Sequence, residues 1–312
     1  MRFACILLAA AVVSITACGG SDPSPSATPA STATPASTAT APPPAAATPA
    51  SPGSAANAFI GSIAVDARSG AVYLGTGMGM FRVDRRGAPP ERVVGQLSTP
   101  SGAGSVSSNL LLRATRPGEL LASGHPEGGT LPENLGLIRS TDGGATWSPV
   151  AQVGEADFHL LALSGKRVVG VKADESDVLV SDDGGTSFEP RTPPAAPVDL
   201  AVDPRDAKRM IVSTEQGVFT SSDDGRSWRP RDAPAGARLA WSVKGPLYAA
   251  DRTGQVSVST DGGQSWSPRG KIGMTPNALT AAGENLFASV ANGEVWFSGD
   301  GGKTWRRYAK LR

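Results

Sequence analysis

The residues of this sequence most capable of chemistry are its only two histidines, His125 and His159. Carboxylate side chains stand near them along the chain, at Glu127, Glu155 and Asp157. Imidazole combined with carboxylate suits Zn²⁺ or Cu²⁺, and the same groups can bind a small polar molecule. These five residues therefore form the predicted ligand-binding set.

Two methionines support a narrower hypothesis of metal binding. Met78 and Met80 lie on either side of a glycine, and thioether added to imidazole suits Cu⁺. A structural interpretation competes with it, in which the methionines pack beside glycine, His159 is a satisfied core imidazole and His125 is a loop residue. No cofactor is established by the sequence; a divalent metal or copper, held by these four residues, is the hypothesis.

The elements that would position these residues follow from a motif that occurs five times, about 40 residues apart. Each copy has the form Ser-x-Asp-x-Gly-x-Ser/Thr-aromatic, as in SGDGGKTW at the end of the chain. Its aspartate and aromatic residues are Asp142 and Trp147, Asp183 and Phe188, Asp223 and Trp228, Asp261 and Trp266, and Asp300 and Trp305.

The composition of the motif predicts a tight hairpin between the third and fourth strands of each repeat. Glycine supplies the backbone conformations of a tight turn, and the aspartate carboxylate can accept backbone N–H groups inside it. The aromatic residue would begin the fourth strand and cover the turn with apolar surface. Five copies around a ring cannot share one active site, so these ten residues are predicted to be structural.

Self-similarity with this period is typical of four-stranded propeller blades. A first repeat precedes the five motifs, and there the motif has decayed: Val83, Arg85 and Pro90 stand where Ser140, Asp142 and Trp147 stand in the next. The prediction is an all-β fold over residues 58–312, a six-bladed β-propeller of four-stranded antiparallel blades. No residues are left for a seventh blade.

Propeller topology also predicts where a ligand would bind. The loops between second and third strands and the links between blades share one face, whereas the repeated motifs lie on the other. The two longest connections, 96–109 and 125–135, fall on the first face. Insertions beyond the repeat are where function concentrates. The only two histidines lie on the same face, and neighbouring blades would bring them to one rim.

The N-terminal segment is interpreted separately from the fold. Residues 1–17 have a basic start and an apolar stretch too short to span a membrane, so they predict a secretion signal. The residues Ile15 to Cys18 resemble the bacterial lipoprotein signal, which implies that Cys18 is lipidated. Residues 18–57 are almost entirely Ala, Pro, Ser and Thr, a composition that predicts a disordered tether.

Charge and cysteine content limit the partners. The chain has 29 basic and 28 acidic residues, which removes the electrostatic case for nucleic-acid binding. Processing would remove Cys5 and leave Cys18 alone, so no intrachain disulfide is expected. We expect a monomer that contacts a membrane only through its lipid anchor, on the outer membrane, facing the periplasm or at the cell surface.

The repeated motifs resemble the Asp-box, or bacterial neuraminidase, repeats of β-propellers. The group includes sialidases, sortilin-type receptor domains and a photosystem assembly factor. The stretches GLIRSTDGGATW and VDPRDAKRM are most similar to exported bacterial lipoproteins with such propellers, which are often labelled glycosyl hydrolases on fold resemblance alone. The resemblance implies the fold and carries little information about activity.

Sialidase activity is disfavoured by the residues that the resemblance would require. Sialidases of this fold use three arginines, a tyrosine nucleophile with a glutamate partner and an aspartate acid/base, and their first arginine lies in Tyr/Phe-Arg-Ile-Pro. This chain offers only Phe-Arg-Val-Asp at residues 81–84, and Tyr73, Tyr248 and Tyr308 match no nucleophile context. No catalytic residue is predicted.

The sequence therefore favours a membrane-anchored, exported lipoprotein whose propeller is a binding or assembly module for an envelope protein, peptide or glycan. Two alternatives stay open. One is a diverged sialidase-like glycosyl hydrolase; the other is an envelope protein that binds copper or zinc.

Overall fold

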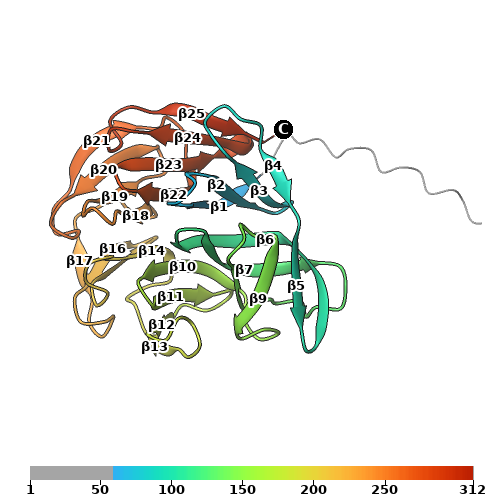
Figure 1. The fold of residues 1–312 in the computed structure, drawn as a ribbon. Coiled ribbons are helices and arrows are strands. Elements are labelled where there is room, and N and C mark those ends of the chain that lie inside the picture. Colours follow the sequence, from blue (N-terminus) through green and yellow to red (C-terminus); the bar gives the residue numbers. More distant parts are fainter. Residues whose placement is uncertain (1–58, 312) are drawn as a thin grey trace, which may run out of the picture. The chain divides into compact units, whose positions relative to one another are not determined.

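Residues 59–311 are described by the structure, a computed structural model, and they fold almost entirely as β-sheet (Figure 1). The helical element of this part of the chain is one short 3₁₀ turn, Ala291–Gly293. The predicted signal, the predicted lipidation site Cys18 and the predicted tether lie outside the described residues. Among residues 59–311 there is no helix long and apolar enough to cross a membrane.

Five sheets are four-stranded antiparallel blades in which the strands follow chain order. The first comprises β1 (Ile60–Val65), β2 (Val72–Thr76), β3 (Gly79–Val83) and β4 (Glu91–Val93). The next in the chain comprises β10 (Phe158–Ser164), β11 (Arg167–Lys172), β12 (Val178–Ser181) and β13 (Glu189–Arg191). It is followed by β14 (Pro197–Val202), β15 (Met210–Thr214), β16 (Gly217–Ser221) and β17 (Arg229–Arg231).

The last two blades repeat this arrangement. One contains β18 (Arg238–Trp241), β19 (Leu247–Ala250), β20 (Gln255–Ser259) and β21 (Ser267–Lys271). The other contains β22 (Pro276–Ala282), β23 (Asn285–Val290), β24 (Glu294–Ser298) and β25 (Arg306–Lys310). The predicted propeller of four-stranded antiparallel blades is thereby confirmed.

The prediction of six such blades is wrong in its count, because the second repeat forms a different sheet. Its strands are β5 (Gly95–Thr99), β6 (Gly102–Arg116), β7 (Glu119–Glu127), β8 (Leu137–Ser140) and β9 (Thr146–Ala151). This sheet closes on itself because β5 pairs with β6 and also, in parallel, with β9. Much of the predicted long connection 96–109 is therefore a β-hairpin and not a loop.

A glycine permits this closure. Gly95 lies so close to the indole of Trp147 that a Cβ atom would stand 2.3 Å from Nε1. The N–H of Gln96 then donates to the carbonyl of Ala145 at 2.9 Å. A larger residue at 95 would push β5 away from the motif of the second repeat, so the extra strand depends on this close approach.

The first strands of the blades, together with β6 of the closed sheet, contact one another in a ring (Figure 1). The order is β1, β6, β10, β14, β18, β22 and back to β1. Thr280 donates from Oγ1 to the carbonyl of Ile63 at 2.8 Å, and Ser289 donates from Oγ to that of Ile60 at 2.9 Å. Last and first blades are thus joined by side chains, without a shared strand.

All five repeated motifs form the predicted hairpin with the same hydrogen bonds. In the blade of β14 to β17, Ser221 donates from Oγ to Asp223 at 2.8 Å and accepts the N–H of Gly225 at 2.8 Å. Ser227 donates to the same carboxylate from Oγ at 2.6 Å and from its N–H at 2.9 Å. These donors, the Ser227 hydroxyl foremost, lower the pKa of Asp223 to about 2. The structure thus contains the hairpin that the motif predicted.

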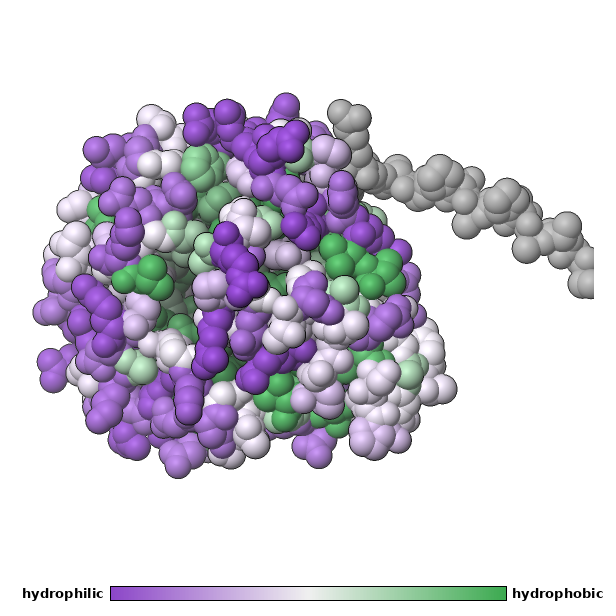
Figure 2. Space-filling model, in the orientation of Figure 1, coloured by the Kyte–Doolittle hydropathy of each residue, from purple (hydrophilic) through white to green (hydrophobic). Residues whose placement is uncertain are grey.

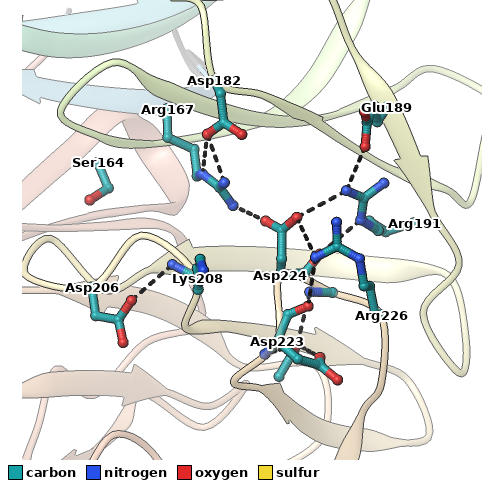
Figure 3. Close-up of polar contacts among 12 residues, drawn as sticks. Ser164, Arg167, Asp182, Glu189, Arg191, Asp206, Lys208, Asp223, Asp224 and Arg226 are labelled. Carbon is teal, nitrogen blue, oxygen red and sulfur yellow. Dashed lines mark hydrogen bonds and ion pairs between the residues drawn. The ribbon is translucent and has the colours of Figure 1, made fainter.

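One Asp box carries an additional buried ion cluster between blades (Figure 3). Asp224 has φ of 71° at the place where the other boxes have glycine, and its side chain is buried. It forms ion pairs with Arg167, with Arg191 at 2.9 Å and with Arg226 at 3.0 Å. Burial opposes ionisation, but the hydrogen bonds from Arg191 and Arg167 keep the pKa of Asp224 below its usual value.

Candidate functional site

A pocket of about 390 Å³ lies where the first strands converge, and it is the strongest candidate for a ligand site. Its walls come from the turn between β2 and β3, from β6, and from the beginnings of β10, β14, β18 and β22. This is the face on which the sequence placed the ligand site. The titratable residues that line it are His125, His159, Asp157, Arg113, Asp199 and Arg238. In Figure 2 apolar side chains gather in a hollow among hydrophilic ones.

The two histidines meet at one carboxylate on the pocket wall. Asp157 Oδ2 lies 2.9 Å from Nε2 of His159 and 3.4 Å from Nε2 of His125. Nδ1 of His125 lies 2.9 Å from the carbonyl of Glu133, which fixes its ring, whereas His159 is exposed. The predicted grouping of His125, His159 and Asp157 is what the structure shows.

The other predicted site residues lie apart from this trio. Glu127 is exposed and pairs with Arg92 at 2.6 Å, and Glu155 is exposed without lining the pocket. Met80 is fully buried in the core with Trp147, and Met78 is exposed at 47%. Met80 therefore cannot ligate a metal held by the histidines, because its thioether is committed to packing at Gly144.

Metal binding finds little geometric support. Within the described range, residues 59–311, no group of three or more His, Cys, Asp or Glu side chains is arranged to hold an ion. The imidazoles of His125 and His159 share one carboxylate, His159 through a hydrogen bond and His125 at an ion-pair distance of 3.4 Å, and ordinary polar contacts explain this arrangement.

Two arginines that the sequence analysis missed face the same pocket. Arg113 donates from Nε to the carbonyl of Leu161 at 2.6 Å and from Nη1 to that of Leu112 at 2.9 Å. Arg238 donates from Nη1 to the carbonyl of Val198 at 2.9 Å. Within residues 59–311, Nη2 of both guanidinium groups has no hydrogen-bond acceptor. The pocket therefore presents N–H donors to a ligand.

A buried carboxylate stands between these cations. Asp199 is 7% exposed and accepts the N–H of Leu200 at 2.8 Å and that of Leu239 at 2.9 Å. Desolvation raises the pKa of Asp199, against the opposing effects of Arg238, the Leu239 N–H and Arg113. Burial also disfavours the charged form of Arg113 and so lowers its pKa. Hydrogen bonds with the backbone hold Arg113, Arg238 and Asp199 in place.

The rest of the wall combines apolar side chains with the uncharged polar residues Thr76, Asn109, Asn277 and Thr280. Phe158 is 1% exposed and Leu279 is 7% exposed, whereas Phe59 at the pocket edge is 60% exposed. Fixed donors beside apolar walls are typical of pockets that bind organic ligands and peptides. The sequence offered one signal for the missed residues: a charge interrupts the apolar run of an inner strand in LLRA, VDLA and ARLA.

Comparisons with known proteins agree with the fold. Residues 138–149 and 257–268 match the BNR/Asp-box repeat model. No curated protein sequence matches the chain. The solved structure of YCF48 bound to a D1 peptide is similar with a TM-score of 0.52 and 16% identity, over 81% of this chain and 94% of that one.

A GH74 xyloglucanase from Xanthomonas campestris is also similar, with a TM-score of 0.47 and 19% identity, over 81% of this chain and 45% of that one. The likeness to the YCF48 structure, at 16% identity, shows a shared fold alone and leaves the activity open. The described part of the chain is a β-propeller with BNR/Asp-box repeats.

Proposed function

We propose that this protein is a binding module whose central pocket holds an extended segment of a partner polypeptide. The observation that supports it is the combination of Arg113 and Arg238, each with an unpaired Nη2, with the apolar walls formed by Phe158 and Leu279. Guanidinium donors suit the carbonyl and carboxylate oxygens of a peptide, and the apolar walls suit its side chains.

The YCF48 structure supports the same class of ligand by analogy of fold. That protein is described as bound to a D1 peptide, and its structure aligns over most of both chains. A rigid ring with donors fixed by backbone contacts pays little ordering entropy on binding, which suits recognition of an extended segment. The ligand class for this chain is therefore a peptide, in preference to a glycan.

Selection from a displayed library of random decapeptides tests the proposal. Wild type is expected to enrich a set of peptides. Two variants should bind these peptides roughly tenfold more weakly. Asn277→Trp narrows the pocket, and Arg238→Gln removes N–H donors. Lys303→Glu, an exposed change in an Asp box, is the matched control and should bind as wild type does. Enrichment that is equal on wild type and Asn277→Trp would contradict the proposal.

A glycosyl hydrolase is the alternative, and one observation favours it. Asp157 and Asp199 line the same pocket, and burial raises the pKa of Asp199, as a general acid requires. However, both oxygens of Asp199 accept backbone N–H groups, so proton donation to a substrate would compete with a contact between blades. Hydrolysis of aryl glycosides by wild type, abolished in both Asp157→Asn and Asp199→Asn, would establish this function instead.

The same proposal includes anchoring of the propeller to the cell envelope through Cys18. It is supported by the apolar stretch and small residues that precede this cysteine, and by the Ala/Pro/Ser/Thr segment that follows it. Metabolic labelling with an alkyne fatty acid should mark wild type and leave Cys18→Ser unlabelled. Equal labelling of both proteins would remove the anchor from the proposal.

A further inference from the structure

A second cavity lies at the junction between the last and first blades, away from the central pocket. Its volume is about 850 Å³. One wall is Phe81 of β3 with the turn 86–90, and the other is the stretch from Arg307 to Leu311, which includes most of β25. The turn is tied to this strand because the N–H of Gly87 donates to the carbonyl of Tyr308 at 2.9 Å.

At each of the remaining junctions between neighbouring sheets, the aromatic side chain of an Asp box fills the space that is a cavity here. Trp147 packs in a core cluster with Tyr73 and Met80 of the preceding blade. Trp305 packs in the same way with Tyr248 and Val256 of the blade before it. The remaining box aromatics, also inserted into clusters shared by two sheets, are Phe188, Trp228 and Trp266.

The first blade has no aromatic residue to insert, because its Asp box has decayed and Pro90 stands where Trp147 stands in the next repeat. Trp147 lies against Gly95. Lys310 is the counterpart of Gly95 in the last blade, because it follows Trp305 by the same spacing as Gly95 follows Pro90. Lys310 lines the cavity.

One aromatic residue of the last blade, Tyr308, lines the same space. Its ring packs against that of Phe297 at a centroid distance of 6.0 Å. The cavity is therefore the position of a missing aromatic side chain, partly filled from the opposite wall.

The charged residues that line this cavity are all basic. Its lining includes Arg86, Arg307 and Lys310, and no acidic side chain. Arg307 and Lys310 share the carboxylate of Glu294, at 3.3 and 3.5 Å, whereas Arg86 has no ion-pair partner within residues 59–311. With the charge of Glu294 included, the residues at the cavity still carry net positive charge, and Phe81, Tyr308 and Leu311 add apolar surface. This combination favours an acidic ligand with an aromatic group.

We propose that this cavity is a docking site for an acidic segment of a partner protein that inserts one aromatic side chain beside Tyr308. The box aromatics at the other junctions define the shape that fits, and Arg86, Arg307 and Lys310 define the charge. The chain's own residues 19–57 do not meet this description, since they contain no aromatic residue and only one acidic residue, Asp22.

The test uses a dye-labelled peptide, Asp-Glu-Trp-Glu-Asp with both ends blocked, and fluorescence anisotropy with the full chain. Wild type and Lys303→Glu, a charge reversal in an intact Asp box, should bind it equally. Arg86→Glu should weaken binding roughly tenfold. Pro90→Trp, which restores the missing aromatic residue, should abolish binding and raise the unfolding midpoint. The peptide with Ala in place of Trp should not bind.

Three results would overturn the proposal. One is binding to wild type that is unchanged in Arg86→Glu and in Pro90→Trp. Another is equal binding of the peptide that lacks Trp, which would reduce the site to a basic surface. The third is self-association of wild type in sedimentation that Pro90→Trp abolishes, which would make a second copy of this chain the occupant. If Pro90→Trp does not fold, Arg86→Glu and the two peptides still decide.

Discussion

The carboxylate of Asp199, on β14, accepts the backbone N–H of Leu239, on β18, at 2.9 Å. A polar group in the central pocket is therefore also a contact between two blades. Ser62 has a comparable role, since its hydroxyl joins β1 to the carbonyl of Leu110 at 2.8 Å on β6. Asp199 therefore contributes both to the lining of the pocket and to the joining of the ring.

Substitution of Asp199 should reveal this double role. In Asp199→Asn the amide can accept only one of the two N–H groups, and an unpaired buried donor costs about 1–3 kcal/mol of stability. Because the pKa of Asp199 is raised in the folded state, wild type loses stability as the pH rises from the ordinary aspartate range through that raised pKa. The deficit of Asp199→Asn should shrink over the same range, and urea unfolding at several pH values measures it.

Asp224→Gly tests whether the ion cluster or the backbone conformation dominates at this turn. Glycine relieves the positive φ, a gain of about 1 kcal/mol, but leaves the buried guanidinium groups of Arg167 and Arg191 without Asp224, which costs about 3–5 kcal/mol. We expect net destabilisation of about 2–4 kcal/mol. Asp182→Asn removes only the exposed partner of Arg167 and should change stability by less than about 1 kcal/mol.

The Asp boxes predict a loss of stability in acid. The pKa of Asp223 is about 2 in the folded chain, below the ordinary value of about 3.9. Its contribution is therefore complete above about pH 5 and lost as the pH falls from about 4 through 2. In Asp223→Asn the dependence of the urea midpoint on pH should be flatter in this range. Asp232→Asn, an exposed carboxylate outside the boxes, is the control, and equal slopes in the two variants would contradict the prediction.

Gly95→Ala should disturb the closed sheet. The new Cβ atom would stand 2.3 Å from Nε1 of Trp147 and 2.7 Å from the carbonyl oxygen of Gly144. We expect about 1–3 kcal/mol of destabilisation, with a changed tryptophan fluorescence spectrum in the native state. Gln96→Ala, at an exposed neighbouring position, should leave both properties as in wild type.

Regular parts of the fold follow directly from the sequence, because the Asp boxes fix where each outer hairpin turns. The rim trio of His125, Asp157 and His159 follows too, since the end of the second strand of one repeat and the start of the first strand of the next share one face. Strand β5 does not, because the segment that forms it is polar and its pairing depends on how closely Gly95 approaches Trp147. Asp199 and Arg238 were also missed, as their roles arise from contacts between strands that are distant in sequence.

Each sheet is made from one uninterrupted stretch of chain, and the last is joined to the first by side-chain contacts and one backbone hydrogen bond, without a shared strand. Ile60 and Leu311, from opposite ends of the described chain, belong to one apolar cluster. Covalent continuity is therefore no more essential at one junction than at another. A circular permutant that opens the chain between two other blades, and links the original ends, would keep every sheet intact. The order of the sheets around the ring is thus set by the side-chain contacts between neighbouring sheets. It does not depend on which sheet comes first along the polypeptide.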